Sequence, residues 1–589
     1  MTAKEKVSRL REEMQRQQID AFIVYSADPH MSEYLPEIWQ ERVWLSGFTG
    51  SAGLVVITKE KAGLWTDGRY FTQAELQLNG SGIDLFKDGI VGTPNYIDWI
   101  VSQIPENGKV AVNALTTSHA NWTAVEKELL DNNRKLVHAP LLNNIWTNRE
   151  GKLTHPIFVQ PLSRAGKSAE DKIADIRAEM KQSGATFHII SMLDDIAWTL
   201  NLRGSDIECN PVFLSYCILT EHEIHLFVDK HRLEKEAVEM LGKQSISVHA
   251  YEEYFEFLKT VKNEKILVAS NANQMTFDAL KDNNELIVND APAHLMKALK
   301  NETELKGFHS AMEKDGVAMV KFLYWLTQNV GKEPMDEYSI GEKLLGFRQE
   351  QKDFVGVSFD SIVGYNGNGS IIHYKAPKEG CAKVTNSGSI LIDSGGQFLE
   401  GTTDITRTLP LGDVSEEFKH DYTLVLKAHI DLAMIKFPRG TRGVQLDVLA
   451  RQPLWNEGKD FNHGTGHGVG CFMNVHEGPQ SIRKDYNPQV LLPGMVISNE
   501  PGYYLVGKYG IRHENLLAVR SWKTTEWNEF YEFETITYCP FFKEAIVKEL
   551  LSDEEIKWFN NYHQLVKEKL ESHLEGAVKD WFLKMVEPL

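Results

Sequence analysis

Two patterns of apolar and polar residues follow one another near the start of the chain, one typical of helices and one of short strands. Val7, Leu10 and Met14 recur at helical spacing in VSRLREEMQRQQ, and the apolar runs AFIVYSADP, SAGLVVIT and GLWTDGRYF follow. Helical spacing predicts an amphipathic helix, and short apolar runs between polar turns predict strands. The chain is therefore predicted to begin with an α/β domain.

The same order of segments returns later, as IADIRAEMKQSG, TFHIISMLDD, LSYCILT and IHLFVDKHR. The matching positions are Arg11 with Arg177, Met14 with Met180, Thr58 with Thr220, and Asp67 with Asp229. A second copy of one supersecondary unit explains these matches, and chance similarity between amphipathic helices is the alternative. We predict two α/β domains of about 150 residues each, in the usual size range of a domain.

The rest of the chain has a different texture. A polar stretch at 147–172 is predicted to connect the two repeats, with Ser168 and Asp171 as a helix start, and Asn301 with Glu304 forms a second such start. Glycine-punctuated β-rich runs fill 355–540, and apolar spacing after Ser552 predicts terminal helices. We expect an α+β chain with domains at 1–155, 156–300 and 301–545 and a helical tail at 546–589.

Bulk composition excludes several classes of protein. Lys and Arg number 63 and Asp and Glu 82, for a formal net charge of −19, and no Lys/Arg-rich run is present. Nucleic acid is therefore not an expected partner. The five cysteines are scattered without a C-x-x-C pair, which argues against a disulfide framework or a thiolate zinc site. Neither a membrane span nor a signal peptide is recognisable, so we expect no membrane partner and a cytoplasmic protein.

Four acidic residues end or interrupt apolar strands, where a charge is costly without a partner. SILIDSGG places Asp393 before a predicted turn at Gly395 and Gly396, and GTTDITRTLP places Asp404 on the returning strand. MVISNEPG and GIRHENLLAVR place Glu500 and Glu514 in the same way. Ordinary surface acids are the alternative, but two matched hairpins would gather four carboxylates that repel one another. A divalent cation would remove that penalty.

The stretch FNHGTGHGVG, residues 461–470, alternates glycine with larger residues. Read as a strand, it sends His463 and His467 to one face and leaves the other bare, so that another backbone can approach closely. A phosphate loop is excluded, because neither G-x-x-x-x-G-K-[ST] nor G-x-G-x-x-G is present. A lone histidine is usually structural, yet two on one face beside four acids favour one of them as a metal ligand.

Asp393, Asp404, His467, Glu500 and Glu514, with the contexts HGTGHGVG, NEPG and RHEN, resemble the ligand set of the pita-bread metallopeptidases. That family includes methionine aminopeptidase, prolidase and aminopeptidase P. Two creatinase-like α/β domains ahead of a pita-bread domain, with GFTGSAG, LWTDGRYF, SFDSIVGYNGNGSIIHY and LIDSGGQF, resemble the long, three-domain Xaa-Pro aminopeptidases (aminopeptidase P). The resemblance covers nearly the whole chain and is strongest at 355–540.

The resemblance implies roles for individual residues. Asp393 would hold one metal, His467 and Glu500 the other, with Asp404 and Glu514 bridging both and a water or hydroxide between. His373 would contact the scissile peptide and His476 would stabilise the tetrahedral intermediate. His463 would line the pocket for proline, Arg69 would bring the first domain to the substrate, and Arg512 would support the site. Glu500 would also take the proton of the attacking water.

The resemblance also implies an activity, cofactors and partners. The expected protein is a dinuclear metal exopeptidase that releases the first residue of peptides whose second residue is proline, with two Mn²⁺ ions, or Zn²⁺ or Co²⁺. A prolidase-type dipeptidase and a catalytically inactive peptide-binding module are the alternatives. A homodimer is expected. The tail offers aromatic residues for contact with a partner or for packing against their own domain: Trp558, Phe559, Trp581 and Phe582.

Overall fold

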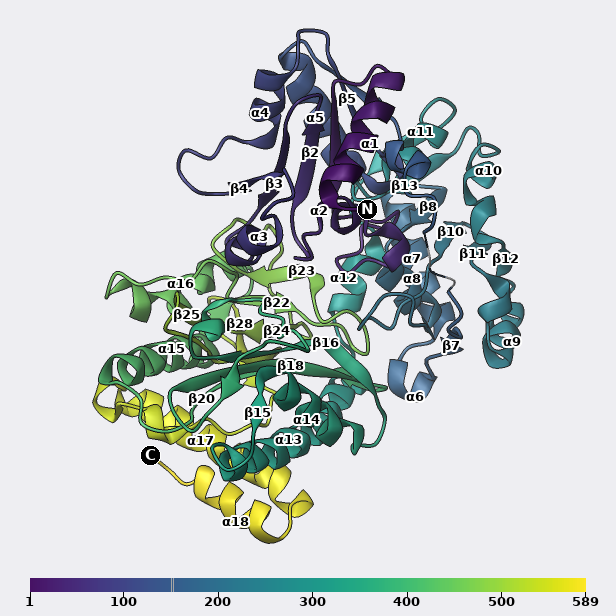
Figure 1. The fold of residues 1–589 in the computed structure, drawn as a ribbon. Coiled ribbons are helices and arrows are strands. Elements are labelled where there is room, and N and C mark those ends of the chain that lie inside the picture. Colours follow the sequence, from purple (N-terminus) through teal and green to yellow (C-terminus); the bar gives the residue numbers. More distant parts are fainter. Residues whose placement is uncertain (150, 152) are drawn as a thin grey trace. The chain divides into compact units, whose positions relative to one another are not determined.

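The computed structural model describes residues 1–149, 151 and 153–589. It divides into two compact units, one of Met1–Gln160 with Ser168–Ala293 and one of Pro161–Lys167 with His294–Leu589 (Figure 1). The connection predicted at 147–172 includes positions 150 and 152, which lie outside the described residues. Its remainder contains β7 (Phe158–Val159), which pairs with β9 (Leu202–Arg203), and the short helix α6 (Leu162–Ala165).

The first unit contains two six-stranded sheets that share one topology. The first has the order β4-β3-β2-β1-β5-β6 and the second the order β12-β11-β10-β8-β13-β14. In both sheets, three consecutive strands form an antiparallel meander, β1, β2 and β3 in the first and β8, β10 and β11 in the second. The remaining three pairings of each sheet are parallel. The strands of the first sheet are β1 (Ala21–Tyr25), β2 (Leu54–Thr58), β3 (Ala62–Thr66), β4 (Asp84–Lys87), β5 (Lys109–Val112) and β6 (Lys135–His138).

The second sheet and the helices complete this unit. The strands are β8 (Phe187–Ile190), β10 (Tyr216–Thr220), β11 (Ile224–Phe227), β12 (Ser247–His249), β13 (Lys265–Val268) and β14 (Glu285–Val288). The helices are α1 (Ala3–Arg16), α2 (Glu41–Ser46), α3 (Phe71–Gln77), α4 (Tyr96–Gln103), α5 (His119–Asp131), α7 (Ala169–Ser183), α8 (Leu193–Leu200), α9 (Lys235–Lys243), α10 (Tyr254–Leu258) and α11 (Gln274–Leu280). Helix α12 (Pro292–Ala298) crosses the boundary between the units.

Matched contacts confirm the predicted repeat. Arg11 Nε donates to the carbonyl of Thr58 at 2.9 Å, and Arg177 Nε donates to the carbonyl of Thr220 at 2.9 Å. In each copy the first helix thereby holds the end of the second strand of the meander. The sequence matches therefore reflect equivalent contacts.

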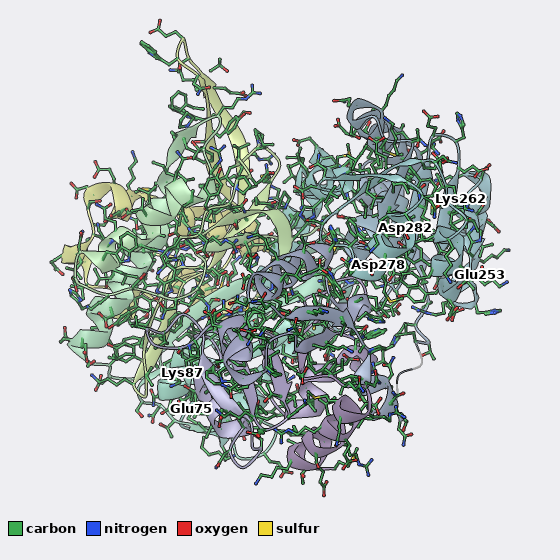
Figure 2. All side chains as sticks on the ribbon, turned by 90° about the horizontal axis from the view of Figure 1, so that it is seen from above. Glu75, Lys87, Glu253, Lys262, Asp278 and Asp282 are labelled. Carbon is green, nitrogen blue, oxygen red and sulfur yellow. The ribbon has the colours of Figure 1, made fainter. Side chains whose placement is uncertain are left out.

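Two predicted helix starts are also present. The Ser168 side chain accepts from the backbone N–H of Asp171, and Asn301 and Glu304 form a reciprocal capping box. On the surface of the first unit, Glu75 of α3 and Lys87 of β4 form an exposed ion pair at 2.6 Å, seen side by side in Figure 2. Exposed pairs of this kind contribute little, about 0–1 kcal/mol.

The second unit is built on two larger sheets. One contains β16 (Phe354–Tyr365), β18 (Ser389–Phe398), β19 (Gly401–Thr402) and β20 (Ile405–Pro410). The other runs in the order β21 (Lys436–Pro438), β28 (Glu529–Thr535), β27 (Asn515–Thr524), β24 (Val496–Asn499), β22 (Gly466–Gly468) and β23 (Glu477–Ile482). Two small ribbons pair β15 (Met335–Asp336) with β17 (Lys383–Val384) and β25 (Gly502–Leu505) with β26 (Tyr509–Arg512).

Long helices cover these sheets: α13 (Glu302–Asn329), α14 (Glu337–Gln349), α15 (Glu416–Met434) and α16 (Gly443–Trp455). Asp315 of α13 and Arg348 of α14 form an ion pair that is 0% exposed at both side chains, with Nε 2.7 Å from Oδ1. The hydroxyl of Thr403 donates to the same aspartate at 2.5 Å. The two helices are thus attached to the loop that immediately precedes Asp404.

The C-terminal tail is an integral part of this core. Helix α17 (Asp553–Leu570) and helix α18 (Gly576–Met585) bury Phe559 and Phe582 completely in a cluster that also contains Phe308. Trp558 and Trp581 are partly buried against the same or adjoining clusters. Of the two alternatives for Phe559 and Phe582, contact with a partner or packing against their own domain, the structure shows the second. Packing against their own domain removes these apolar rings from water, which stabilises the fold.

Candidate active site

Two aspartates meet at the hairpin of β18 and β20. Asp393 lies in β18 opposite Thr406, and Asp404 immediately precedes β20. Both are buried. The turn predicted at Gly395 and Gly396 is wrong: β18 continues to Phe398, and the chain reverses at residues 399–400. The glycine is needed for a different reason, because a Cβ at Gly395 would lie 2.0 Å from the carbonyl oxygen of Thr403.

Two glutamates flank a second pair of strands. Asn499 of β24 is paired with Asn515 of β27, so that Glu500 follows one strand and Glu514 precedes the other. The Glu514 N–H donates to the carbonyl of Thr406 at 3.2 Å, and the Thr406 hydroxyl donates to Glu514 Oε2 at 2.6 Å. These two bonds join the hairpins. We call Asp393, Asp404, Glu500 and Glu514 the carboxylate cluster.

His467 of β22 extends into this cluster. Its Nε2 lies 3.5 Å from Asp404 Oδ2 and 3.4 Å from Glu500 Oε1. Ligand atoms of Asp404, His467 and Glu514 all lie within 4.8 Å of one another. Separations of this size place several potential donor atoms around one point, as a cation site requires.

The carboxylate cluster is electrostatically unfavourable when it holds no cation. Burial raises the pKa of Asp404 well above the usual range of an aspartate, and the neighbouring carboxylates raise it further. Burial also raises the pKa of Glu514, to which the charges of Glu500 and Asp393 add. The Thr406 hydroxyl and the Arg512 guanidinium oppose this rise without reversing it.

The residues present fit a divalent cation. Asp393 Oδ1 and Asp404 Oδ1 are buried and accept no hydrogen bond from any described residue. A buried carboxylate oxygen without a donor is costly, and a metal ion removes that cost. Four carboxylates with one imidazole and no thiolate are a donor set for Mn²⁺, Zn²⁺, Co²⁺ or Fe²⁺.

The glycines of residues 461–470 allow two close backbone contacts. A Cβ at Gly466 would lie 1.9 Å from the carbonyl oxygen of Ser498, and one at Gly468 would lie 2.3 Å from that of Glu477. The predicted bare face is therefore present at both positions. The strand is shorter than predicted, since only Gly466–Gly468 is extended in β22. His467 sits between the two contacts, which fix its backbone.

Histidines around the cluster occupy distinct positions. His463 Nε2 lies 2.8 Å from the Tyr504 hydroxyl, and the His476 ring is packed edge-on to His467 with centroids 4.4 Å apart. His373 is half-buried in the segment that follows β16. Arg69 belongs to the first unit, where its guanidinium pairs with Asp67 at 2.7 and 2.8 Å. Its predicted contact with substrate stays a prediction.

Sequence reasoning missed Tyr504 of β25. Its hydroxyl accepts from Arg512 Nη1 at 2.6 Å, while Arg512 Nη2 lies 2.5 Å from Asp393 Oδ2. Arg512, predicted as a supporting residue, thus connects Tyr504 to the carboxylate cluster. Burial raises the pKa of Tyr504 so far that the hydroxyl stays neutral. Its position four residues after Glu500, in GYY, was the available signal.

Arg407 of β20 was also missed. This buried guanidinium has no carboxylate partner among the described residues and instead donates to carbonyl oxygens, including that of Glu514 at 2.7 Å. It lies 4.0 Å from the centre of the Phe541 ring and donates to the Tyr562 hydroxyl of α17 at 3.0 Å. Helix α17 therefore helps to hold Arg407, whose guanidinium binds the backbone at Glu514.

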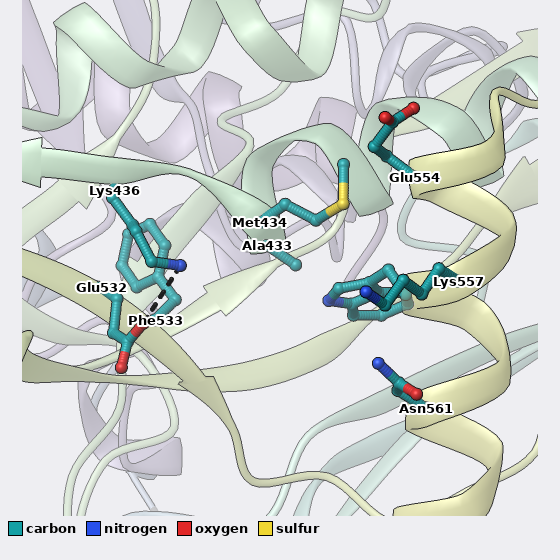
Figure 3. Close-up of a pocket in the computed structure, with 9 residues that line it drawn as sticks. Ala433, Met434, Lys436, Glu532, Phe533, Glu554, Lys557 and Asn561 are labelled. Carbon is teal, nitrogen blue, oxygen red and sulfur yellow. Dashed lines mark ion pairs between the residues drawn. The ribbon is translucent and has the colours of Figure 1, made fainter.

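A separate hollow of about 330 Å³ lies on the second unit, shown in Figure 3. It is lined by Ala433, Met434, Lys436, Glu532, Phe533, Glu554, Lys557, Trp558 and Asn561, with an ion pair between Lys436 and Glu532 at 3.2 Å. No residue of the carboxylate cluster lines it.

Comparisons with known proteins agree with this geometry. Residues 6–144 and 148–304 each match the creatinase/prolidase N-terminal domain, so that each repeat corresponds to one copy. Residues 306–521 match metallopeptidase family M24, and residues 529–589 match the C-terminal region of that peptidase. The fold and the carboxylate cluster thus define a metallopeptidase with a pita-bread catalytic domain.

Relatives specify the group more closely. The chain is 40% identical to a probable Xaa-Pro aminopeptidase P of Laccaria bicolor and 39% identical to Xaa-Pro aminopeptidase 1 of Dictyostelium discoideum. Both matches cover 99% of this chain, with 93% and 96% of the relatives covered. The chain belongs to the Xaa-Pro aminopeptidases of family M24.

Solved structures give the same result. An X-prolyl aminopeptidase of Caenorhabditis elegans, described as a cytosolic enzyme with a dinuclear active site, matches at 32% identity and a TM-score of 0.95, with both chains fully covered. A Xaa-Pro dipeptidase of Bacillus anthracis shares only the fold, at 22% identity and a TM-score of 0.50, over 64% of this chain and 99% of its own. Across the described residues, no helix combines the length and apolarity needed to cross a membrane.

Gly466→Ala tests the close backbone contact beside His467. The added methyl group meets the Ser498 carbonyl, which cannot rotate away, so we expect a loss of about 1–3 kcal/mol of stability and displacement of His467. Calorimetry and metal analysis would measure both effects. Gly464→Ala is the matched control, because its Cβ would meet no atom closer than 3.5 Å. Equal behaviour of the two variants would contradict this account.

Proposed function

We propose that this protein is a metal-dependent Xaa-Pro aminopeptidase, which releases the first residue of peptides whose second residue is proline. The observation that carries the proposal is the convergence of His467 with Asp404, Glu500 and Glu514. Beside them, one buried oxygen of Asp393 and one of Asp404 accept no hydrogen bond from any described residue. The similarity to named Xaa-Pro aminopeptidases over 99% of the chain supports the substrate class.

We propose that two divalent cations, most suitably Mn²⁺, are held by these five residues. In this assignment Asp393, Asp404, His467, Glu500 and Glu514 would together hold the cations, with Asp404, His467 and Glu514 nearest to one another. The fit of carboxylate and imidazole donors supports manganese, with zinc and cobalt as alternatives. Arg512 keeps the second oxygen of Asp393 occupied, which leaves its Oδ1 available to a cation.

When bound, the cations supply Lewis acidity, which makes a water nucleophilic at neutral pH and polarises the peptide carbonyl. The Glu500 carboxylate accepts the proton that this water loses. The Ser498 hydroxyl donates to Glu500 Oε1 at 3.2 Å and so orients this carboxylate. His476 donates to the developing oxyanion and His373 to the scissile peptide, so that both act mainly on the transition state. His463, held by Tyr504, lines the pocket for the proline ring.

The bond to proline explains why a dedicated site is useful. The imino nitrogen carries no N–H and the ring fixes φ, so a peptidase that recognises either feature of an ordinary peptide fails there. A site that binds the free amino terminus through carboxylates and accepts the ring in a pocket avoids both requirements. This argues for exopeptidase action.

The prolidase alternative differs in the length of the leaving group. A dipeptidase needs space for proline alone, whereas an aminopeptidase accepts a longer peptide after it. The full-length match to Xaa-Pro aminopeptidases favours the second. The inactive-module alternative is disfavoured, because all five ligand positions carry ligand residues.

A metal-binding experiment tests the ligand assignment. His467→Ala should lower the bound Mn²⁺ measured by elemental analysis, whereas His463→Ala should retain it. Since the pKa of Asp404 and of Glu514 is raised in the fold, their ionisation destabilises the metal-free protein as pH rises. Added Mn²⁺ should therefore raise the melting temperature more at pH 8 than at pH 5. Full metal retention by His467→Ala would refute the assignment.

Hydrolysis of short peptides tests the activity. Release of the first residue from Xaa-Pro and from Xaa-Pro-Pro peptides should stop with a chelator and return with Mn²⁺, and His467→Ala should abolish it. Cleavage confined to the dipeptide would support a prolidase instead. If the purified protein binds no metal, is unaffected by chelators and cleaves neither peptide, the inactive peptide-binding module would be supported instead.

Two further proposals concern the location of the protein and its oligomeric state. We propose a cytoplasmic location, which is supported by the description of the Caenorhabditis elegans enzyme as cytosolic. We also propose a homodimer, on the family resemblance; sedimentation velocity on the purified protein would check it, and a sharp monomer peak at micromolar concentration would contradict it.

A further inference from the structure

The segment that carries His373 has little cover of its own. Residues 366–382 connect β16 to β17, and all but one of them are half-buried or exposed. A histidine that donates to a transition state must be held within a fraction of an ångström of its place, which such a segment does not provide alone. The restraint has to come from neighbouring elements.

Glu337, the first residue of α14, is one such restraint. The side chain is 0% exposed and accepts from four groups of the His373 segment and its approach. These are Tyr365 N–H at 2.8 Å, Asn368 Nδ2 at 2.9 and 3.1 Å, the Tyr374 hydroxyl at 2.7 Å and Ala382 N–H at 3.0 Å. One carboxylate therefore binds both ends of the segment and the residue next to His373.

The donors on Glu337 are neutral. No Lys, Arg or His forms an ion pair with it among the described residues, so its partners are hydrogen-bond donors and the N-terminus of α14. Loss of any one of these hydrogen bonds would leave a buried carboxylate oxygen with fewer donors, which is costly. The carboxylate therefore favours the conformation in which all its donors stay in place. The Tyr374 hydroxyl and the Asn368 amide are also 3.2 Å apart, which ties the two tethers together.

His373 is flanked by two restrained neighbours. On one side, the carbonyl of Ile372 accepts from Arg512 Nη2 at 3.4 Å, and the same guanidinium pairs with Asp393. On the other side, the Tyr374 hydroxyl donates to Glu337. The backbone before His373 is thus tied to the carboxylate cluster through Arg512, and the residue after it is tied to the start of α14.

We propose that Glu337 is a positioning residue for catalysis, which acts through Tyr374 and Asn368 to hold His373 against the scissile peptide. This inference rests on the proposed function and adds a residue to it that touches neither the substrate nor a ligand residue. The carboxylate is required, since an amide at this position would direct an NH₂ group at N–H and O–H donors.

A double-mutant cycle tests the proposal. Glu337→Gln should lower kcat for an Xaa-Pro-Pro peptide about 10- to 100-fold with KM within about threefold, as expected for a misplaced transition-state donor. Tyr374→Phe should act in the same direction with a smaller loss. In a His373→Ala background, Glu337→Gln should cost less than about threefold further, because the histidine through which it acts is gone.

Controls separate positioning from general damage. Glu342→Gln, an exposed change on the same helix, should leave kcat unchanged, and Glu337→Gln should keep its full content of bound Mn²⁺. Unchanged kcat in Glu337→Gln, or an equal loss with and without His373, would overturn the proposal. If Glu337→Gln fails to fold, Tyr374→Phe carries the same cycle, and an additive result there overturns it equally.

Hydrogen exchange distinguishes failure of this inference from failure of the proposed function. Amides of residues 366–382 should exchange faster in Glu337→Gln than in the wild type, whatever the substrate. A wild type that cleaves no Xaa-Pro peptide would refute the function, whereas unchanged exchange in Glu337→Gln would refute the tether itself.

Discussion

Repulsion among four clustered carboxylates, three of them buried, is the constraint around which the second unit is organised. Burial and the neighbouring carboxylates raise the pKa of Asp404 and of Glu514, and a cation can take the two aspartate oxygens that no described residue donates to. Three other oxygens accept from two hydroxyls and one guanidinium, with Thr406 on Glu514, Ser498 on Glu500 and Arg512 on Asp393. The hydrogen bonds between Thr406 and Glu514 join the two pairs of strands that carry the cluster.

Two buried arginines support this arrangement in different ways. Arg512 neutralises charge, because it pairs with a carboxylate and connects it to Tyr504. Among the described residues, Arg407 has carbonyl, amide and hydroxyl acceptors and an aromatic face but no carboxylate, so it fixes the course of the backbone beside Glu514. Burying an arginine for that purpose is costly. The cost is tolerable here because several acceptors share the guanidinium.

The local sequence pattern alone predicted several residues that the structure brings close together. Apolar strands are interrupted or ended by four acidic residues, Asp393, Asp404, Glu500 and Glu514. The glycines around His467 predicted a close backbone contact, and this contact is present. The repeated first unit was equally readable, since Arg11 and Arg177 keep their place relative to the strands. The turn at Gly395 was misread, because a glycine required by a facing carbonyl looks the same in sequence as one required by a turn. Tyr504 left a local signal, since it follows Glu500 by four residues. Arg407 and Glu337 left none, since most of their partners lie far along the chain and only packing brings them together.

The contact between Arg407 and Tyr562 has a consequence for the order in which the protein is made. Tyr562 follows Glu514 by 48 positions, and it belongs to a helix that also buries Phe559 in the catalytic core. At a synthesis rate of 5–20 residues per second, the carboxylates precede this helix by roughly 2–10 s. During that interval the growing chain carries the ligands without the element that holds Arg407. A segment that is synthesised after all four carboxylates therefore completes the surroundings of the site, which stay incomplete until α17 has been made.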